Sequence, residues 1–304
     1  MQDPFVSLGW FSPSQNLVLD EFASRYGIRE CQRYLFLMLE LLNRAETGVA
    51  IDPDLFHYAY SLCANYVMGK AHRDQTVHTV LSSERQQFNV VKTRITQLLE
   101  RQITEFRYCF PFGRPEGALE KSLSLLERVL TSDNGVPASA DLVRSVIQNC
   151  LRNAAVLNYE RGPTRRLEEI IHLAELCIEV LQQNEEHHAQ SFTWFSDLLV
   201  EHSENFWSLF QTDMQQTMVQ LSEENWEVFH LFQVLNNYLC ATHSLYHGPF
   251  HNYLVETFEP LVDRYISVME SSIMDALLRG IELETWLPAN DPSMLYSHRD
   301  LMIV

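Results

Sequence analysis

The sequence predicts an all-α protein, and three observations lead to this fold class. Apolar residues recur at three- and four-residue spacing in one segment after another, which is the period of a helix with one buried face. The period-two alternation typical of strands hardly appears. Glycine is scarce, with 10 residues in 304, whereas turn-dense β folds and glycine-rich phosphate-binding folds need glycine at many corners.

The first helices are predicted from apolar periodicity together with start and stop signals. A helix from about Leu17 ends at Gly27, because glycine adopts the left-handed conformation that closes a helix. Apolar residues at positions 35, 37–39, 41 and 42 leave residues 30–44 little polar face and predict a buried central helix. Asp52 followed by Pro53 is a typical helix start, an N-cap and a proline in the first turn, and predicts a helix to about residue 68.

A long helix is expected next, followed by a break. Ser83 and Gln86 have the spacing of a capping box and predict a helix that continues to about Tyr108. The proline- and glycine-containing run at residues 110–115 ends it. Leucines at three- and four-residue spacing then predict a helix over about residues 119–130.

The remaining helices are separated by short turns. Gly162 and Pro163 stop a helix over about residues 140–159 and predict the boundary between a first sub-bundle, residues 1–162, and a second, residues 163–304. The second sub-bundle is expected to contain helices near residues 166–187, 190–210, 226–246 and 251–284.

Charge is distributed unevenly between the two halves. The formal net charge is −18, and residues 164–304 hold 5 basic and 22 acidic side chains, against 17 and 18 in residues 1–163. Nucleic acid is excluded as a partner by this balance, because phosphate neutralisation requires a basic surface. Direct contact of the second half with an anionic membrane is disfavoured for the same reason.

The cysteines and the hydropathy predict a cytoplasmic protein. Six cysteines occur without any Cys-x-x-Cys pair and lie in apolar helical patterns, as expected for small core residues in a reducing compartment. No apolar run approaches the roughly 20 residues of a membrane span, and no secretory leader is recognisable.

The sequence gives only weak support for metal-binding or catalytic residues. His243, His247 and His251 are spaced as zinc ligands on one helical face, but Pro249 interrupts the helix between the second and the third. Nucleotide-binding, calcium-binding and serine-hydrolase motifs are missing. The sequence therefore predicts no metal, no cofactor and no enzymatic activity. An all-α enzyme stays as a rival hypothesis, which a pocket with converging polar groups would favour.

Acidic residues follow helical spacing on two segments and give candidate protein-binding residues. Charged residues at this spacing share one face of a helix, and such a face either is simply solvated or docks a basic or helical partner. The candidates are Glu175, Glu179, Glu186, Asp197, Glu201 and Glu204.

Two long segments carry a resemblance to a known family. The run LLERQITEFRYCFPFGRPEGALEKSLSLLERV at residues 98–129 and the run RLEEIIHLAELCIEVLQQNEEHHAQSFTWFSDLLV at residues 166–200 resemble the calcium-dependent activator protein for secretion (CAPS) family. The resemblance extends to LDEFASRYG at residues 19–27 and VDRYISVMESSI at residues 262–273. The part of the family that matches is the MUN-type priming domain.

The resemblance implies an elongated stack of antiparallel helical bundles like the subunits of vesicle-tethering complexes. It also implies a scaffold that primes dense-core vesicles by binding syntaxin and other SNARE proteins and promoting their assembly. Calcium and lipid regulation belong to other domains of the family, so membrane contact is expected to be indirect. The alternative is a tethering or self-association module of the same machinery without direct SNARE binding.

Overall fold

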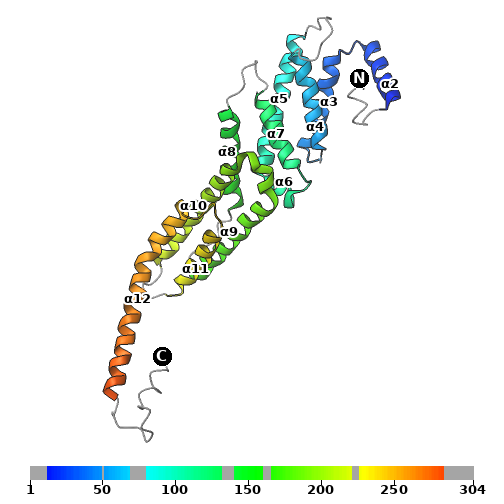
Figure 1. Ribbon diagram of the computed structural model, residues 1–304. Coiled ribbons are helices and arrows are strands. Elements are labelled where there is room, and N and C mark those ends of the chain that lie inside the picture. Colours follow the sequence, from blue (N-terminus) through cyan, green and yellow to red (C-terminus); the bar gives the residue numbers. More distant parts are fainter. Residues whose placement is uncertain are drawn as a thin grey trace. The chain divides into compact units, whose positions relative to one another are not determined.

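The structure, a computed structural model, describes residues 12–49, 51–68, 80–131, 140–159, 166–220 and 226–283. Every regular element in these ranges is helical, which confirms the all-α fold class (Figure 1). The elements are α2 Pro13–Tyr26, α3 Glu30–Glu46, α4 Pro53–Val67, α5 Ser82–Thr104, α6 Phe106–Cys109, η1 Pro111–Gly113, α7 Ala118–Thr131, α8 Ala140–Asn158, α9 Leu167–His188, η2 Ala189–Phe195, α10 Ser196–Gln220, α11 Val228–Ala241 and α12 Pro249–Leu283. None of the described helices is long and apolar enough to cross a bilayer.

Several helix ends follow from the signals in the sequence. Gly27 adopts φ 62° and ends α2, and the Asp52 carboxylate accepts a hydrogen bond from the Asp54 N–H at the start of α4, as predicted. However, α2 begins at Pro13 and not near Leu17. Its start is fixed by a capping box, in which the Ser12 Oγ accepts from the Gln15 N–H.

The long helix predicted to end near Tyr108 differs from the prediction at both ends. It begins at Ser82, one residue before the predicted capping box, and the Glu84 Oε2 accepts the Leu81 N–H at 2.8 Å. The predicted capping box of Ser83 and Gln86 is therefore wrong, because the observed cap, Leu81 with Glu84, lies two residues earlier. The helix also ends at Thr104, and α6 is a separate turn. The few apolar residues at positions 69–79 predict a loop, and the run Asp-Asn-Gly-Val-Pro at positions 133–137 predicts a turn; both segments lie outside the described residues.

Unit 1, one of two compact units in the chain, contains Met1–Gly162 and Leu176–Leu209. In it α3 packs against α4 and α5, α7 packs against α4 and α5, and α8 packs against α5 and α7 (Figure 1). Its core is apolar, with Leu42, Tyr60, Ile95 and Leu126 all fully buried. The large aromatic and aliphatic side chains of this core supply the main stabilisation of the unit.

Unit 2 contains Pro163–Glu175 and Phe210–Val304. Helix α11 packs against the first turns of α12, where the Phe232 and Phe258 rings lie 5.0 Å apart. The predicted boundary at residues 162 and 163 is one of the points where the chain passes between units, although these two residues are outside the described ranges. The return of residues 176–209 to unit 1 is not evident from the sequence, and the predicted division into sub-bundles stays a prediction.

Candidate functional site

The acidic candidates on α9 are exposed. In unit 2 the Glu175 carboxylate lies 3.7 Å from the His172 Nδ1, and in unit 1 the Glu179 Oε1 accepts a hydrogen bond of 3.0 Å from Gln183. Glu186 is also exposed, with its carboxylate 3.9 Å from the His187 ring. These contacts are between near neighbours on one helix, so the carboxylates remain available to a partner.

The acidic candidates on α10 are arranged differently, because α8 supplies partners for two of them. Asp197 forms an ion pair with Arg144. The Glu201 carboxylate accepts hydrogen bonds of 2.7 and 2.9 Å from the Gln148 amide, and Arg152 lies 3.3 Å away. Asp197 and Glu201 therefore hold α10 against α8 within unit 1. Glu204 is half-buried on the same helix.

Residues 106–113, part of the run at residues 98–129 that resembles the family, pack around a buried phenylalanine. The Phe106 ring is fully buried, and its edge-on neighbours are the rings of His188 at 4.9 Å, Phe192 at 5.7 Å and His202 at 6.0 Å. The His188 Nε2 is 3.0 Å from the Phe110 carbonyl oxygen and donates to it. Burial lowers the pKa of His188, so the imidazole is neutral at pH 7.

A second buried histidine ties α10 to α8. The His202 Nδ1–H donates to the Leu151 carbonyl oxygen at 2.8 Å, and the side chain has no exposed surface. Burial lowers the pKa of His202 to about 4. Because the ring is neutral and fully enclosed, its role is structural.

The turn after α6 requires a glycine for a steric reason. Gly113 has φ 68°, and a Cβ at this position would lie 2.4 Å from the His187 carbonyl oxygen. Phe112, the residue before it, adopts φ 54°, which is costly for a residue with a side chain. Its exposed ring lies edge-on against His187, with ring centroids 5.4 Å apart. The backbone of η1 therefore approaches the end of α9 more closely than any side chain would permit.

A cavity of about 380 Å³ lies in unit 1 beside this segment. The end of α3, the first turns of α4 and α7, the end of α5 and the α6 turn form its walls. Most of the wall is apolar, with Leu98, Phe110 and Leu125 among the residues that form it. Arg101 and Lys121 also line it, and none of the described residues that line it is acidic.

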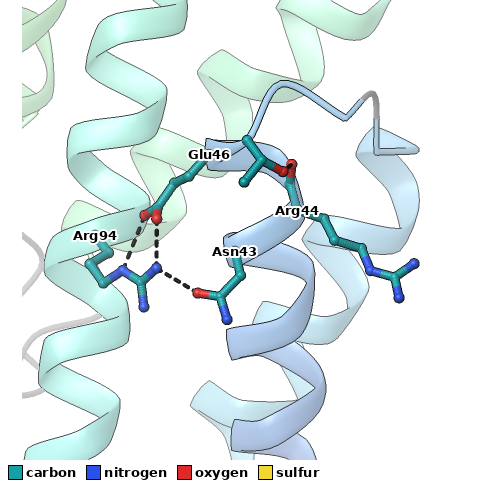
Figure 2. Close-up of polar contacts among 5 residues, drawn as sticks. Asn43, Arg44, Glu46 and Arg94 are labelled. Atoms are coloured by element: carbon teal, nitrogen blue, oxygen red, sulfur yellow. Dashed lines mark hydrogen bonds and ion pairs between the residues drawn. The ribbon is translucent and has the colours of Figure 1, made fainter.

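An arginine clamp fixes the wall that α3 provides. Figure 2 shows Arg94 of α5 reaching Glu46 with two nitrogens, at 3.1 and 2.6 Å, and Asn43 at 2.8 Å. The hydrogen bonds from Arg94 lower the pKa of Glu46. The clamp holds the last turn of α3 on α5, next to Ala45, which lines the cavity.

Beyond Phe258, helix α12 contains no buried residue up to Leu283. Its apolar residues nevertheless keep helical spacing, and five of them with exposed fractions of 38–56% lie on one face. These five residues, called the α12 stripe below, are Ile266, Met269, Ile273, Leu277 and Ile281. Tyr265 packs on rings of the preceding segment, Trp226 at 5.2 Å and Phe229 at 5.5 Å, and it is not part of the stripe. An apolar face at helical spacing that stays this exposed is suited to packing against another helix.

Two of the three spaced histidines, His247 and His251, make structural contacts. The His251 Nδ1 accepts the His247 N–H at 3.0 Å, and its Nε2–H donates to the Asn236 Oδ1 at 3.1 Å. These bonds hold the start of α12 on α11 in unit 2. Within the described part of the chain, no cluster of His, Cys, Asp or Glu is arranged to hold a metal ion.

Comparison with known proteins gives two matches. Residues 146–299 match the family model described as the MUN domain. The chain is 48% identical over 303 residues to the calcium-dependent secretion activator of Drosophila melanogaster, an alignment that covers 94% of this chain and 21% of that protein. The chain therefore spans about a fifth of the length of this relative. No solved structure matches the chain.

Proposed function

Because the chain belongs to the MUN domain family, as its resemblance to the CAPS family predicted, we propose that it is a non-enzymatic scaffold of regulated exocytosis. In this proposal it acts in the cytoplasm at secretory sites, and it primes dense-core vesicles by binding syntaxin and other SNARE proteins. Its contribution to SNARE assembly is to hold a partner helix in place, which reduces the entropy that the helices lose when their complex nucleates.

The observation that carries the proposal is the α12 stripe. Its spacing of three and four residues is the pattern by which one amphipathic helix packs along another. The five side chains are about half exposed, so their complete burial contributes about 4–7 kcal/mol before the entropic cost of association. Association itself costs about 4–15 kcal/mol, so the apolar contact holds a partner helix only together with the charged contacts beside it.

The charge of α12 supports a partner helix with basic residues beside its apolar face. Helix α12 holds six acidic and two basic side chains, and Glu270, Asp275 and Glu282 lie along the part that carries the stripe. Opposite charges on the two helices speed their encounter and fix their register. The contact is therefore expected to weaken as salt concentration rises.

The six acidic candidates remain part of the proposal as a second, electrostatic contact. Glu175, Glu179 and Glu186 are exposed, so their replacement by lysine tests partner binding without removing a contact between helices. Replacement of Asp197 and Glu201 also breaks the pairing with α8 and costs stability. Unchanged syntaxin binding in the α9 triple variant would exclude this contribution.

A titration with the cytoplasmic part of syntaxin tests the proposal at low and high salt. Ile273→Glu places a charge in the centre of the stripe and is expected to weaken binding at least about tenfold, because the carboxylate must be desolvated. Val268→Glu is the matched control on the opposite face of α12, since the two side chains are 47% and 48% exposed. We expect it to change the affinity less than about twofold.

The same two variants distinguish self-association from SNARE binding. If the wild-type protein does not bind syntaxin but sediments as a dimer that Ile273→Glu dissociates, the stripe binds a second copy and the self-association alternative is correct. If both variants bind syntaxin like the wild type, the stripe is not the binding surface and the proposal loses its support.

A further inference from the structure

We propose that the cavity of unit 1 binds an apolar side chain of a partner peptide that carries a carboxylate beside it. This inference goes beyond the proposed function, because it concerns a different surface of opposite charge. It uses neither the α12 stripe nor the acidic residues of α9 and α10.

The size and the walls of the cavity fit an apolar anchor. A volume of about 380 Å³ lies within the range of pockets that bind small ligands and single anchoring side chains. Val49, Leu98, Leu99, Phe110 and Leu125 form much of the wall. An apolar side chain placed there exchanges water for these residues, which is the usual main source of affinity at such an anchor.

The charged groups at the cavity determine which charge the ligand carries beside its apolar side chain. Arg101 lines it, is exposed and makes no ion pair within the described part of the chain. Lys121 also lines it, with its Nζ 2.7 Å from the Asp54 carboxylate. The first turn of α7 lies at the same wall, and the positive end of a helix dipole adds to the positive potential. A carboxylate is favoured there and an ammonium group is disfavoured.

The surroundings of the cavity favour a peptide over a free fatty acid. The Tyr108 side chain is 69% exposed and that of Val49 is 52% exposed, although both line the cavity. A small ligand inside the cavity leaves these apolar surfaces in water, whereas a peptide covers them. Exposed aromatic residues around a pocket are typical of sites that bind a protein chain.

The cavity is held open by contacts that do not involve a ligand. The Arg94 clamp fixes the end of α3, and the hydrogen bond between His188 and the Phe110 carbonyl fixes the α6 turn. A preformed site loses little conformational entropy on binding. Short peptides therefore suffice as probes.

Three dipeptides with one apolar side chain test the inference on the full chain: N-acetyl-Phe-Glu-amide, N-acetyl-Phe-Gln-amide and N-acetyl-Phe-Lys-amide. Occupancy is read from the rate at which iodoacetamide alkylates Cys109, an exposed thiol that lines the cavity. Cys240 is also exposed but lies in unit 2, so its rate is the control in the same sample.

We expect the glutamate peptide to slow alkylation of Cys109 and to leave Cys240 unaffected. It should bind about two- to fivefold more tightly than the glutamine peptide, as an exposed ion pair allows, and the lysine peptide most weakly. Arg101→Gln should remove the preference for glutamate. Arg85→Gln, an exposed arginine 16 residues earlier on α5, should retain it.

Three results would overturn the inference. One is that none of the peptides protects Cys109. Another is equal affinity for the glutamate and lysine peptides. The third is protection by decanoate without protection by any peptide, which would assign the cavity to a free fatty acid. None of these measurements uses a SNARE protein, so their failure is independent of the proposed function.

Discussion

Acidification is expected to destabilise unit 1 through His202. This ring is fully buried and donates to the Leu151 carbonyl oxygen, and its pKa is lowered from 6.5 to about 4. The folded protein therefore stays unprotonated at pH values where the unfolded chain binds a proton. Its contribution to stability is complete above pH 6.5, declines as the pH falls from 6.5 to about 4, and is lost below that value.

The size of the effect follows from the difference between the two pKa values. Each unit of pKa difference corresponds to about 1.4 kcal/mol, so the change from 6.5 to about 4 gives about 3 kcal/mol. His57 and His188 also have lowered pKa values because of burial, and they add to the acid sensitivity of the same unit. A matched variant is therefore needed to isolate His202.

Urea unfolding of the wild type and His202→Asn at several pH values separates this contribution. The asparagine amide can still donate to the Leu151 carbonyl oxygen but does not titrate, and His57 and His188 are unchanged in both proteins. We expect His202→Asn to be the less stable protein at neutral pH, with the difference shrinking by about 3 kcal/mol toward pH 4. Equal pH dependence of the two proteins, or a His202 imidazole that titrates near pH 6.5 in the folded protein, would refute the reasoning.

Two further predictions concern the close approach of η1 to α9 and the Arg94 clamp on α3. Gly113→Ala should lower the free energy of unfolding by about 1–3 kcal/mol, because the new Cβ meets the His187 carbonyl oxygen and φ is positive. Gly117 has a similar φ, but a Cβ there would have nothing within 4 Å. In thermal unfolding, Gly117→Ala should therefore lose less stability than Gly113→Ala, because it has only the conformational cost of a positive φ and no steric clash. Arg94→Gln should lower the stability by about 1 kcal/mol, since the ion pair is partly exposed. This loss should vanish in urea unfolding at high salt and below the lowered pKa of Glu46, where the carboxyl is protonated; a loss independent of pH would contradict the assignment.

The sequence predicts the helices well because their signals are local. The helix predicted from residue 30 and the start of α4 at Pro53 are confirmed, since an apolar face and an N-cap need only neighbouring residues. The predicted start of α5 is wrong by two residues, since the N-cap is Leu81 and not Ser83, and Glu84 takes the place of Gln86 as the capping side chain. Helix α10 continues to Gln220, ten residues past the predicted end, although no stop signal marks either position.

The candidate site could be predicted only where one helix contains the whole pattern. The α12 stripe follows from the spacing of apolar residues along a single helix, so hydrophobic periodicity alone could have predicted it. The pairing of Glu201 with Gln148 and Arg152 joins residues about 50 positions apart, and the cavity is formed by five elements. Such features depend on tertiary packing, which periodicity and capping do not encode.

Hydrogen exchange of the full chain with and without the cytoplasmic part of syntaxin tests the central claim most directly. Without a partner, the backbone amides of α12 after Phe258 should exchange quickly, because no side chain there is buried. Addition of syntaxin should slow exchange in residues 266–281 of the wild type and not of Ile273→Glu. Unchanged exchange in these residues while syntaxin is bound would contradict the assignment of the α12 stripe as the SNARE-binding surface.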